Sequence, residues 1–142
     1  MKMLNARGTA LVKLWLASER ISSRVDHSLG AVHGIGYVEF MVLQQLAQSP
    51  AGQMRRVDLA NAIGRTASGV TRLLKPMEKI GLVQRGSSER DARVSLVALS
   101  AAGREKLEDA LLTVNDLAER LTRPVGDSQL DSAAGFLATL CD

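Results

Sequence analysis

Residues Val57–Leu99, VDLANAIGRTASGVTRLLKPMEKIGLVQRGSSERDARVSLVAL, contain the pattern that decides the fold. Apolar side chains recur there at the spacing of one helix face in two runs, Leu59, Ala60 and Ile63, then Val70, Leu73 and Leu74. Gly64 interrupts the pattern between the runs, and Thr66 can cap the second helix. Two helices joined by such a tight turn are typical of a helix-turn-helix.

The outward face of the predicted second helix carries small, hydroxylic and basic side chains. They are Ser68, Gly69, Thr71, Arg72 and Lys75. This combination suits a helix whose first turns lie in the major groove of DNA. Pro76 follows, and because it lacks an N–H for the Arg72 carbonyl, it predicts a kink. The kink would fall beyond the groove-facing turns, so we expect residues 68–72 to be helical.

Past Gly81 the apolar period changes from helical spacing to alternation. Leu82–Arg85 and Val94–Leu99 can pair as antiparallel strands, with Gly86–Arg93 as the tip between them. A helix-turn-helix followed by a hairpin with a basic tip is a winged helix. We therefore predict a mainly α fold, an α+β winged helix-turn-helix with about six helices and a two-stranded β-wing.

The net charge of +3 is unevenly distributed along the chain. Residues 53–93 carry nine basic and four acidic side chains, a net charge of +5, whereas residues 94–142 have a net charge of −4. Basic runs are usually solvated surface. Here, however, the positive charge coincides with the segment that the pattern assigns to DNA, where phosphates have to be neutralised. The balance favours double-stranded DNA as the partner.

Composition limits the class of protein. The length of 142 residues suits a single domain. No apolar run approaches the roughly 20 residues that span a bilayer, and the N-terminus lacks the apolar core and cleavage site of a signal peptide. We therefore expect a cytoplasmic protein without a membrane partner. The single cysteine, Cys141, excludes an intrachain disulfide framework and a cysteine-rich zinc site.

The N-terminal third of the chain predicts two helices. The first is expected over Asn5–Ser28, followed by a loop over Leu29–Gly36, which contains three glycines. Tyr37–Gln48 is apolar on more than one face and predicts a buried central helix, which Ser49–Gly52 ends. The first helix has an apolar stripe at heptad-like spacing, formed by Leu11, Leu14, Ile21 and Val25.

The C-terminal third predicts two further helices. Ser100 can cap a long helix over Ala101–Arg123, and Asp127 or Ser128 can cap a last one. The long helix has a second apolar stripe, formed by Leu107, Leu111, Val114, Leu117 and Leu121. Apolar stripes in terminal segments can pack within the chain or against a second subunit.

With the wing in place, the chain resembles the multiple-antibiotic-resistance-regulator (MarR) family of bacterial transcription factors over nearly its whole length. The residues that carry the resemblance are Asp91-x-Arg93, Leu99-Ser100-x-x-Gly103, Leu59-Ala60 to Gly64, Thr71-Arg72-Leu73 and Met77-Glu78-Lys79-x-Gly81-Leu82-Val83. Two residues depart from the family pattern: Arg55 stands where a capping Ser or Thr is common, and Pro76 makes the second helix less regular.

The resemblance implies a homodimeric, sequence-specific DNA-binding transcriptional regulator, a ligand-responsive repressor. Residues 1–142 would form one MarR-type domain, with residues 35–100 as the winged helix-turn-helix and residues 1–30 and 101–142 as the helical dimerisation region. Two winged helices related by a two-fold axis would bind a pseudo-palindromic operator with half-sites ~10 bp apart.

The resemblance also assigns roles to residues. Major-groove and phosphate contacts fall to Thr66, Ser68, Gly69, Thr71, Arg72 and Lys75. In the wing, Arg93 would reach the minor groove with Asp91 orienting it, and backbone contacts fall to Arg85, Ser87, Ser88 and Arg90. A small aromatic or amphipathic effector could bind between the dimer-forming helices and the winged helix, in a pocket lined by Trp15, His27, His33, Tyr37 and Met41. Each of these five is equally suited to a core.

No catalytic constellation is recognisable, so we predict neither an enzyme nor a cofactor. His27 and His33 lack a Cys, Asp or Glu cluster at ligand spacing, which argues against a metal site. Cys141 has the features of a buried or incidental thiol. The alternative function is a winged-helix module that binds another protein without sequence-specific DNA binding, and the salt dependence of duplex binding separates the two.

Overall fold

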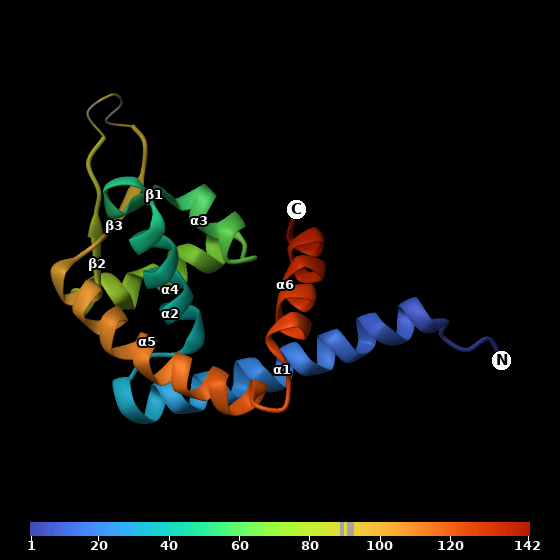
Figure 1. The fold of residues 1–142 in the computed structure, drawn as a ribbon. Helices are drawn as coiled ribbons and strands as arrows, with labels where there is room; N and C mark the ends of the chain where they lie inside the picture. Colours follow the sequence, from blue (N-terminus) through green and yellow to red (C-terminus); the bar gives the residue numbers. More distant parts are fainter. Residues whose placement is uncertain (89, 91–92) are drawn as a thin grey trace.

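The computed structural model describes residues 1–88, 90 and 93–142, and it shows six α-helices and one small antiparallel sheet in these residues (Figure 1). The elements are α1 (Ala6–His33), α2 (Tyr37–Gln48), the 3₁₀ turn η1 (Pro50–Gly52), β1 (Gln53–Arg55), α3 (Arg56–Ala62), α4 (Ala67–Lys79), β2 (Val83–Arg85), β3 (Leu96–Leu99), α5 (Ala101–Thr122) and α6 (Asp127–Cys141). The predicted winged helix-turn-helix is confirmed.

Helix α1 is longer than predicted, and the prediction of a loop over residues 29–36 is wrong. The helix continues to His33 because Leu29 is fully buried in the core and holds the last turns in place. Gly34 ends it in the left-handed conformation, with φ of 68°, which glycine adopts without a steric cost. At the other end, the Asn5 side chain accepts a hydrogen bond from the Gly8 N–H (2.9 Å).

The sheet has three strands in the order β1-β3-β2, not the two of the predicted hairpin alone. Strand β2 pairs with β3 in the predicted antiparallel manner, with Val83 opposite Leu99. Strand β1 adds to the other side of β3, with Gln53 opposite Ala98. The two-stranded wing therefore has a third strand at its base.

The helix-turn-helix follows the prediction closely. Gly64 lies in the turn with φ of 64°. Thr66 caps α4 by accepting a hydrogen bond from the Gly69 N–H (3.1 Å). Helix α4 remains continuous through Pro76 to Lys79, so the groove-facing turns are helical as expected.

The core lies around α2, against which α1, α3, α5 and the sheet pack. Its fully buried side chains include Val42, Leu43, Leu46, Leu59, Val70, Leu74 and Val97. Helix α5 begins on the turn before β2, because the Ser100 hydroxyl donates to the Leu82 carbonyl (2.9 Å) while accepting from the Gly103 N–H (2.9 Å). The predicted cap of α5 is therefore confirmed, and the same side chain fastens the helix to the sheet.

The terminal helices differ in how much of their apolar surface the single chain buries. Helix α5 packs along α1, so Leu107 and Leu117 of its stripe are buried within the single chain. By contrast, none of the described residues of α6 is buried, and its N-cap is Gly126 instead of Asp127 or Ser128. Figure 1 shows α6 standing apart from the winged helix, and the N-terminal half of α1 extending beyond the rest of the chain.

Candidate nucleic-acid interface

Helix α4 separates its side chains into a buried and an exposed face. Val70, Leu74 and Met77 are buried against the core. The predicted groove-facing residues all lie on the exposed side, namely Thr66, Ser68, Gly69, Thr71, Arg72 and Lys75. The structure therefore brings together on one face the six residues that the sequence assigned to it.

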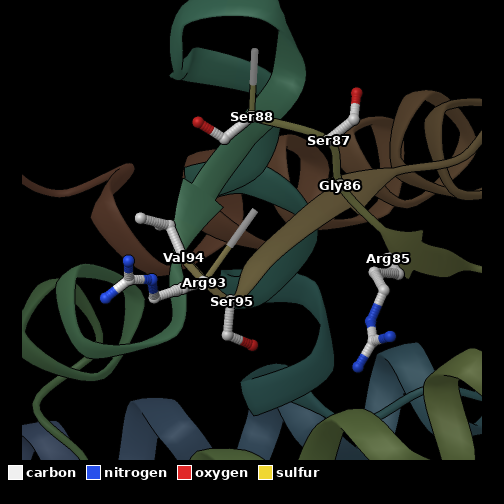
Figure 2. A pocket seen from close by; sticks show the side chains of 7 residues that line it. All are labelled: Arg85, Gly86, Ser87, Ser88, Arg93, Val94 and Ser95. Carbon is white, nitrogen blue, oxygen red and sulfur yellow. The ribbon is translucent and has the colours of Figure 1, made fainter. Parts of the chain in front are cut away.

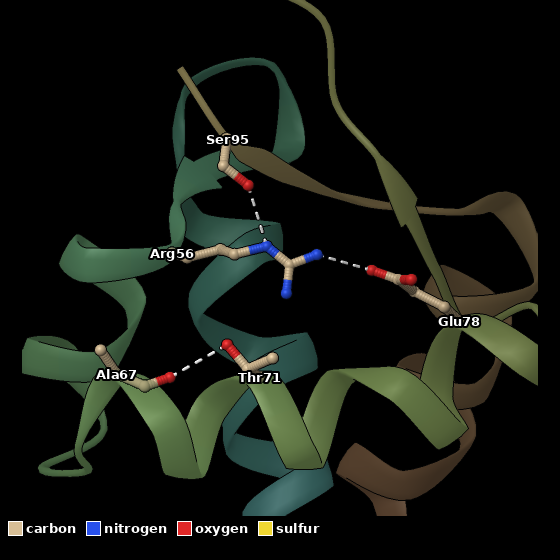
Figure 3. Close-up of polar contacts among 5 residues, drawn as sticks. All are labelled: Arg56, Ala67, Thr71, Glu78 and Ser95. Atoms are coloured by element: carbon tan, nitrogen blue, oxygen red, sulfur yellow. Dashed lines mark hydrogen bonds and ion pairs between the residues drawn. The ribbon is translucent and has the colours of Figure 1, made fainter. Parts of the chain in front are cut away.

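Hydrogen bonds within α4 limit what its hydroxyl groups can offer. The Thr71 hydroxyl donates to the carbonyl of Ala67 (3.1 Å), as Figure 3 shows. Because its proton is used within the helix, this oxygen can serve only as an acceptor for a further partner, and a methyl group lies beside it. Those are the groups that suit an exocyclic amine or a thymine methyl at the edge of a base pair.

Two of the described acidic side chains near this face are engaged by arginines. Asp58, in the first turn of α3, receives two hydrogen bonds from Arg55, at 2.7 and 2.9 Å. Hydrogen bonding by the Arg55 guanidinium lowers the pKa of the Asp58 carboxyl below its usual value. Glu78, in the last turn of α4, is paired with Arg56 at 2.9 Å. Pairing reduces the repulsion that these carboxylates would exert on a phosphate backbone.

The wing carries the second group of predicted residues. Its two arms enclose a pocket of about 310 Å³ lined by Arg85, Gly86, Ser87, Ser88, Arg93, Val94 and Ser95. Figure 2 shows that the guanidinium groups of Arg85 and Arg93 come from opposite arms. Arg90 is exposed, whereas Asp91, the predicted orienting carboxylate, lies outside the described residues.

Two residues at the base of the wing were not expected from the sequence. The Gln53 side chain, on β1, donates to the Ser87 carbonyl on one arm (3.1 Å). The Arg56 side chain donates to the Ser95 hydroxyl on the other arm (3.0 Å). No periodic signal marks either residue, since the partners lie 34 and 39 positions away in sequence.

The five residues predicted to line an effector pocket lie in different surroundings. Trp15 is 67% exposed on the projecting half of α1. His33 shares a hydrogen bond with Thr113 of α5 (2.7 Å), and Tyr37 accepts one from Arg65 (3.0 Å). Met41 is partly buried against the core.

His27, the fifth of these residues, lines an open cavity between α1 and α5, in which Val32 and Leu112 are 67% and 72% exposed. Its volume is about 510 Å³, and its walls are His27, Ser28, Ala31, Val32, Leu112, Thr113, Asp116 and Arg120. This volume falls in the range of small-molecule sites, roughly 300–1,000 Å³. Asp116 and Arg120 form an ion pair at 3.0 Å on its α5 side.

Within residues 1–88, 90 and 93–142, no group of three His, Cys, Asp or Glu side chains is arranged to hold a metal ion. Cys141 is exposed at the end of α6, so it is not a buried thiol. Across the same described residues, no helix combines the length and the apolar character needed to cross a membrane.

Comparison with known proteins places this geometry in a family. The sequence profile of the MarR family matches residues 35–95, from just before α2 to the residue before β3. The chain belongs to the MarR family. It is 35% identical over 109 residues to the uncharacterized HTH-type transcriptional regulator YdgJ from Bacillus subtilis, covering 69% of this chain and 66% of that protein. MarR proteins are transcriptional regulators and not enzymes.

Two further relatives extend the comparison beyond this segment. This chain is 28% identical over 87 residues to the HTH-type transcriptional regulator PrsX from Escherichia coli, and the match covers 61% of this chain and 52% of PrsX. It therefore spans about half the length of that relative. Its fold resembles the crystal structure of Sco3205, a MarR family transcriptional regulator from Streptomyces coelicolor, in complex with DNA, with a TM-score of 0.86, 22% identity and coverage of 97% and 91% of the two chains.

Proposed function

We propose that this MarR-family chain is a sequence-specific DNA-binding transcriptional regulator that acts as a homodimeric repressor. The observation that carries the proposal is the exposed face of α4. There, six small, hydroxylic or basic side chains lie together, while the opposite face is held in the core. An α-helix fits the major groove, and Arg72 can donate two parallel hydrogen bonds to a guanine edge.

The wing extends the same surface. In this proposal, Arg85, Ser87, Ser88 and Arg90 contact the phosphate backbone and Arg93 reaches the adjacent minor groove; the exposure of Arg85, Ser87 and Arg90 supports it. A narrow minor groove has a strongly negative potential that favours an inserted arginine. In this proposal, residues 35–100 form the DNA-binding region.

Dimerisation would come from both ends of the chain, residues 1–30 and 101–142. Helix α6 and the projecting half of α1 expose apolar side chains that the single chain leaves in water, including Leu11, Trp15, Leu16, Phe136 and Leu140. So many exposed apolar side chains on two terminal helices support an interface between proteins. A two-fold axis through it would set two α4 helices on half-sites about 10 bp apart in a pseudo-palindrome.

A small aromatic or amphipathic molecule is the proposed effector. The cavity between α1 and α5 offers His27, apolar walls and the Asp116–Arg120 pair. It lies between helices assigned to the dimer, so a ligand bound there could change how the two winged helices are spaced. Equilibrium binding of aromatic carboxylates, with and without the substitution Leu112→Asp in the cavity wall, tests this assignment.

Selection from a random pool of duplexes tests the function itself. We expect recovery of a pseudo-palindrome with half-sites about 10 bp apart. Binding of the selected duplex should weaken steeply with salt, because several lysines and arginines release counterions from the phosphates. If no duplex is enriched and binding depends weakly on salt, the winged helix serves protein contacts instead.

A further inference from the structure

Arg56 lies where three elements meet. It is the first residue of α3, and its side chain donates to the Ser95 hydroxyl before β3 (3.0 Å) and to the Glu78 carboxylate in the last turn of α4 (2.9 Å). Figure 3 shows the guanidinium between these two groups. The Arg56 bridge, as we name these three residues, joins the wing to α4 across 39 and 22 positions of sequence.

The hydrogen bonds of the Arg56 bridge restrict the orientation of the wing relative to α4. The Arg56 backbone N–H also donates to the Ser95 carbonyl (3.3 Å), so both the main chain and the side chain of Arg56 are hydrogen-bonded to Ser95 in the wing. A planar guanidinium makes hydrogen bonds in fixed directions, and bonds to a carboxylate are stronger than neutral ones. The Arg56 side chain is only 27% exposed, which reduces screening of its pair with Glu78.

We propose that Arg56 is a positioning residue that sets the angle between the wing and α4, and hence the register of minor-groove and major-groove contacts. This inference rests on the proposed function. Both contacts can form at once only if the angle matches the spacing of the grooves, and an angle fixed in advance lowers the ordering cost of binding. Arg56 then acts through geometry, since Glu78 already neutralises its charge.

The sign of the effect at Glu78 distinguishes this role from simple charge. Glu78→Gln removes a negative charge from the DNA-facing helix, so bulk electrostatics predicts tighter binding to a duplex. The bridge predicts weaker binding, because the wing loses its tie to α4. We expect Glu78→Gln and Arg56→Gln each to weaken binding of the selected duplex roughly tenfold.

Arg55 provides a matched control. It is the neighbouring residue and carries the same charge, but its side chain pairs with Asp58 in the first turn of α3. Among the described residues, that side chain forms no ion pair with the wing or with α4. Arg55→Gln removes the same positive charge and should change affinity by at most about threefold. If Arg56→Gln lowers the affinity for the selected duplex no more than Arg55→Gln does, the proposal is overturned.

Two double substitutions report on mechanism. Arg56→Gln with Glu78→Gln should bind no more weakly than either single variant, because both break one bridge. Arg93→Ala should strongly weaken binding of the selected duplex when it is made in the parent chain. Made in the Arg56→Gln variant, it should weaken binding much less, since the wing is then no longer held in the minor groove. Full additivity of Arg93→Ala and Arg56→Gln would show that the bridge does not position the wing.

Two measurements separate the possible failures. If the parent chain binds no duplex, the proposed function fails; if the parent binds but Glu78→Gln binds equally well or more tightly, this inference alone fails. Thermal melting by circular dichroism checks that the variants are folded. Should Arg56→Gln unfold, Ser95→Ala removes one hydrogen bond from the bridge and leaves both charges in place. It should weaken binding a few-fold, and parent-like affinity would contradict the bridge.

Discussion

At the scale of single residues, Gly103 allows α5 to pack closely against the Leu82 carbonyl. It lies in the first turn of α5, which Ser100 fastens to the Leu82 carbonyl. A Cβ atom at position 103 would collide with that carbonyl oxygen, so only glycine allows helix and sheet to approach this closely. The Leu99-Ser100-x-x-Gly103 motif therefore has a packing reason that is independent of DNA.

Gly103→Ala should lower the free energy of unfolding by about 1–3 kcal/mol, even though alanine favours helix by about 1 kcal/mol. The control is Gly30→Ala in α1, where an added Cβ meets no other atom within 4 Å. Urea unfolding of both variants measures the difference. A Gly103→Ala variant as stable as Gly30→Ala would show that helix α5 can shift away from Leu82 at little cost.

Ala51 is the described non-glycine residue with positive φ, at 56° in the η1 turn. The left-handed conformation costs a residue with a Cβ about 1–2 kcal/mol, and glycine loses about 0.4–1 kcal/mol through its freer unfolded state. Ala51→Gly should therefore raise the melting temperature slightly. Ala118→Gly, at an exposed helical position of α5, should lower the free energy of unfolding by the usual helix penalty of about 1 kcal/mol, and so lower the melting temperature. Changes of the same sign at both sites would contradict the backbone argument.

At the scale of elements, α4 presents Arg72 near the middle of its exposed face. If Arg72 reads a base edge, Arg72→Ala should weaken binding of the selected duplex by roughly 1–3 kcal/mol and relax preference at one position. Arg20→Ala, on α1, removes the same charge away from the wing and α4 and should have little effect. Equal weakening on selected and random duplexes would make Arg72 a phosphate contact, and no weakening on either would contradict the docking of α4.

The helix-turn-helix and wing were predictable because their signals are local. Glycines, caps and apolar periods all lie within the elements that they define. Strand β1 was missed because three residues are too few to show alternation, and its partners around Ala98 are remote in sequence. The end of α1 was missed because burial of Leu29 outweighs the glycines that follow. The Arg56 bridge depends on tertiary structure, so no spacing rule could have found it.

At the scale of the whole molecule, the two C-terminal helices, α5 and α6, differ in where their apolar side chains lie. Leu117 is only 9% exposed in the single chain, so the α5 stripe contributes to the monomer core and is a poor place to test assembly. Helix α6 carries the apolar surface that the monomer leaves uncovered, with Phe136 51% and Leu140 50% exposed. Since these two side chains are four residues apart, they share one face of the helix.

Phe136→Asp combined with Leu140→Asp should therefore give a folded monomer. The two charges cannot be buried without partners, whereas neither side chain is part of the core, so fold and helix content should persist. Affinity for a full pseudo-palindrome should fall by at least about 10²-fold, because the second half-site no longer binds within the same complex. Light scattering, circular dichroism and titration of full and half sites measure these effects.

Leu117→Asp is the contrasting variant for this prediction. It places a carboxylate inside the single chain, so it should unfold the protein instead of dissociating it. The proposed dimer is contradicted if the α6 double variant keeps the mass of a dimer, or if the parent chain is a monomer that binds the full site as one unit. If the α6 double variant instead has the mass of a monomer, loses full-site affinity and keeps half-site binding, assembly is assigned to α6 and DNA contact to α4 and the wing.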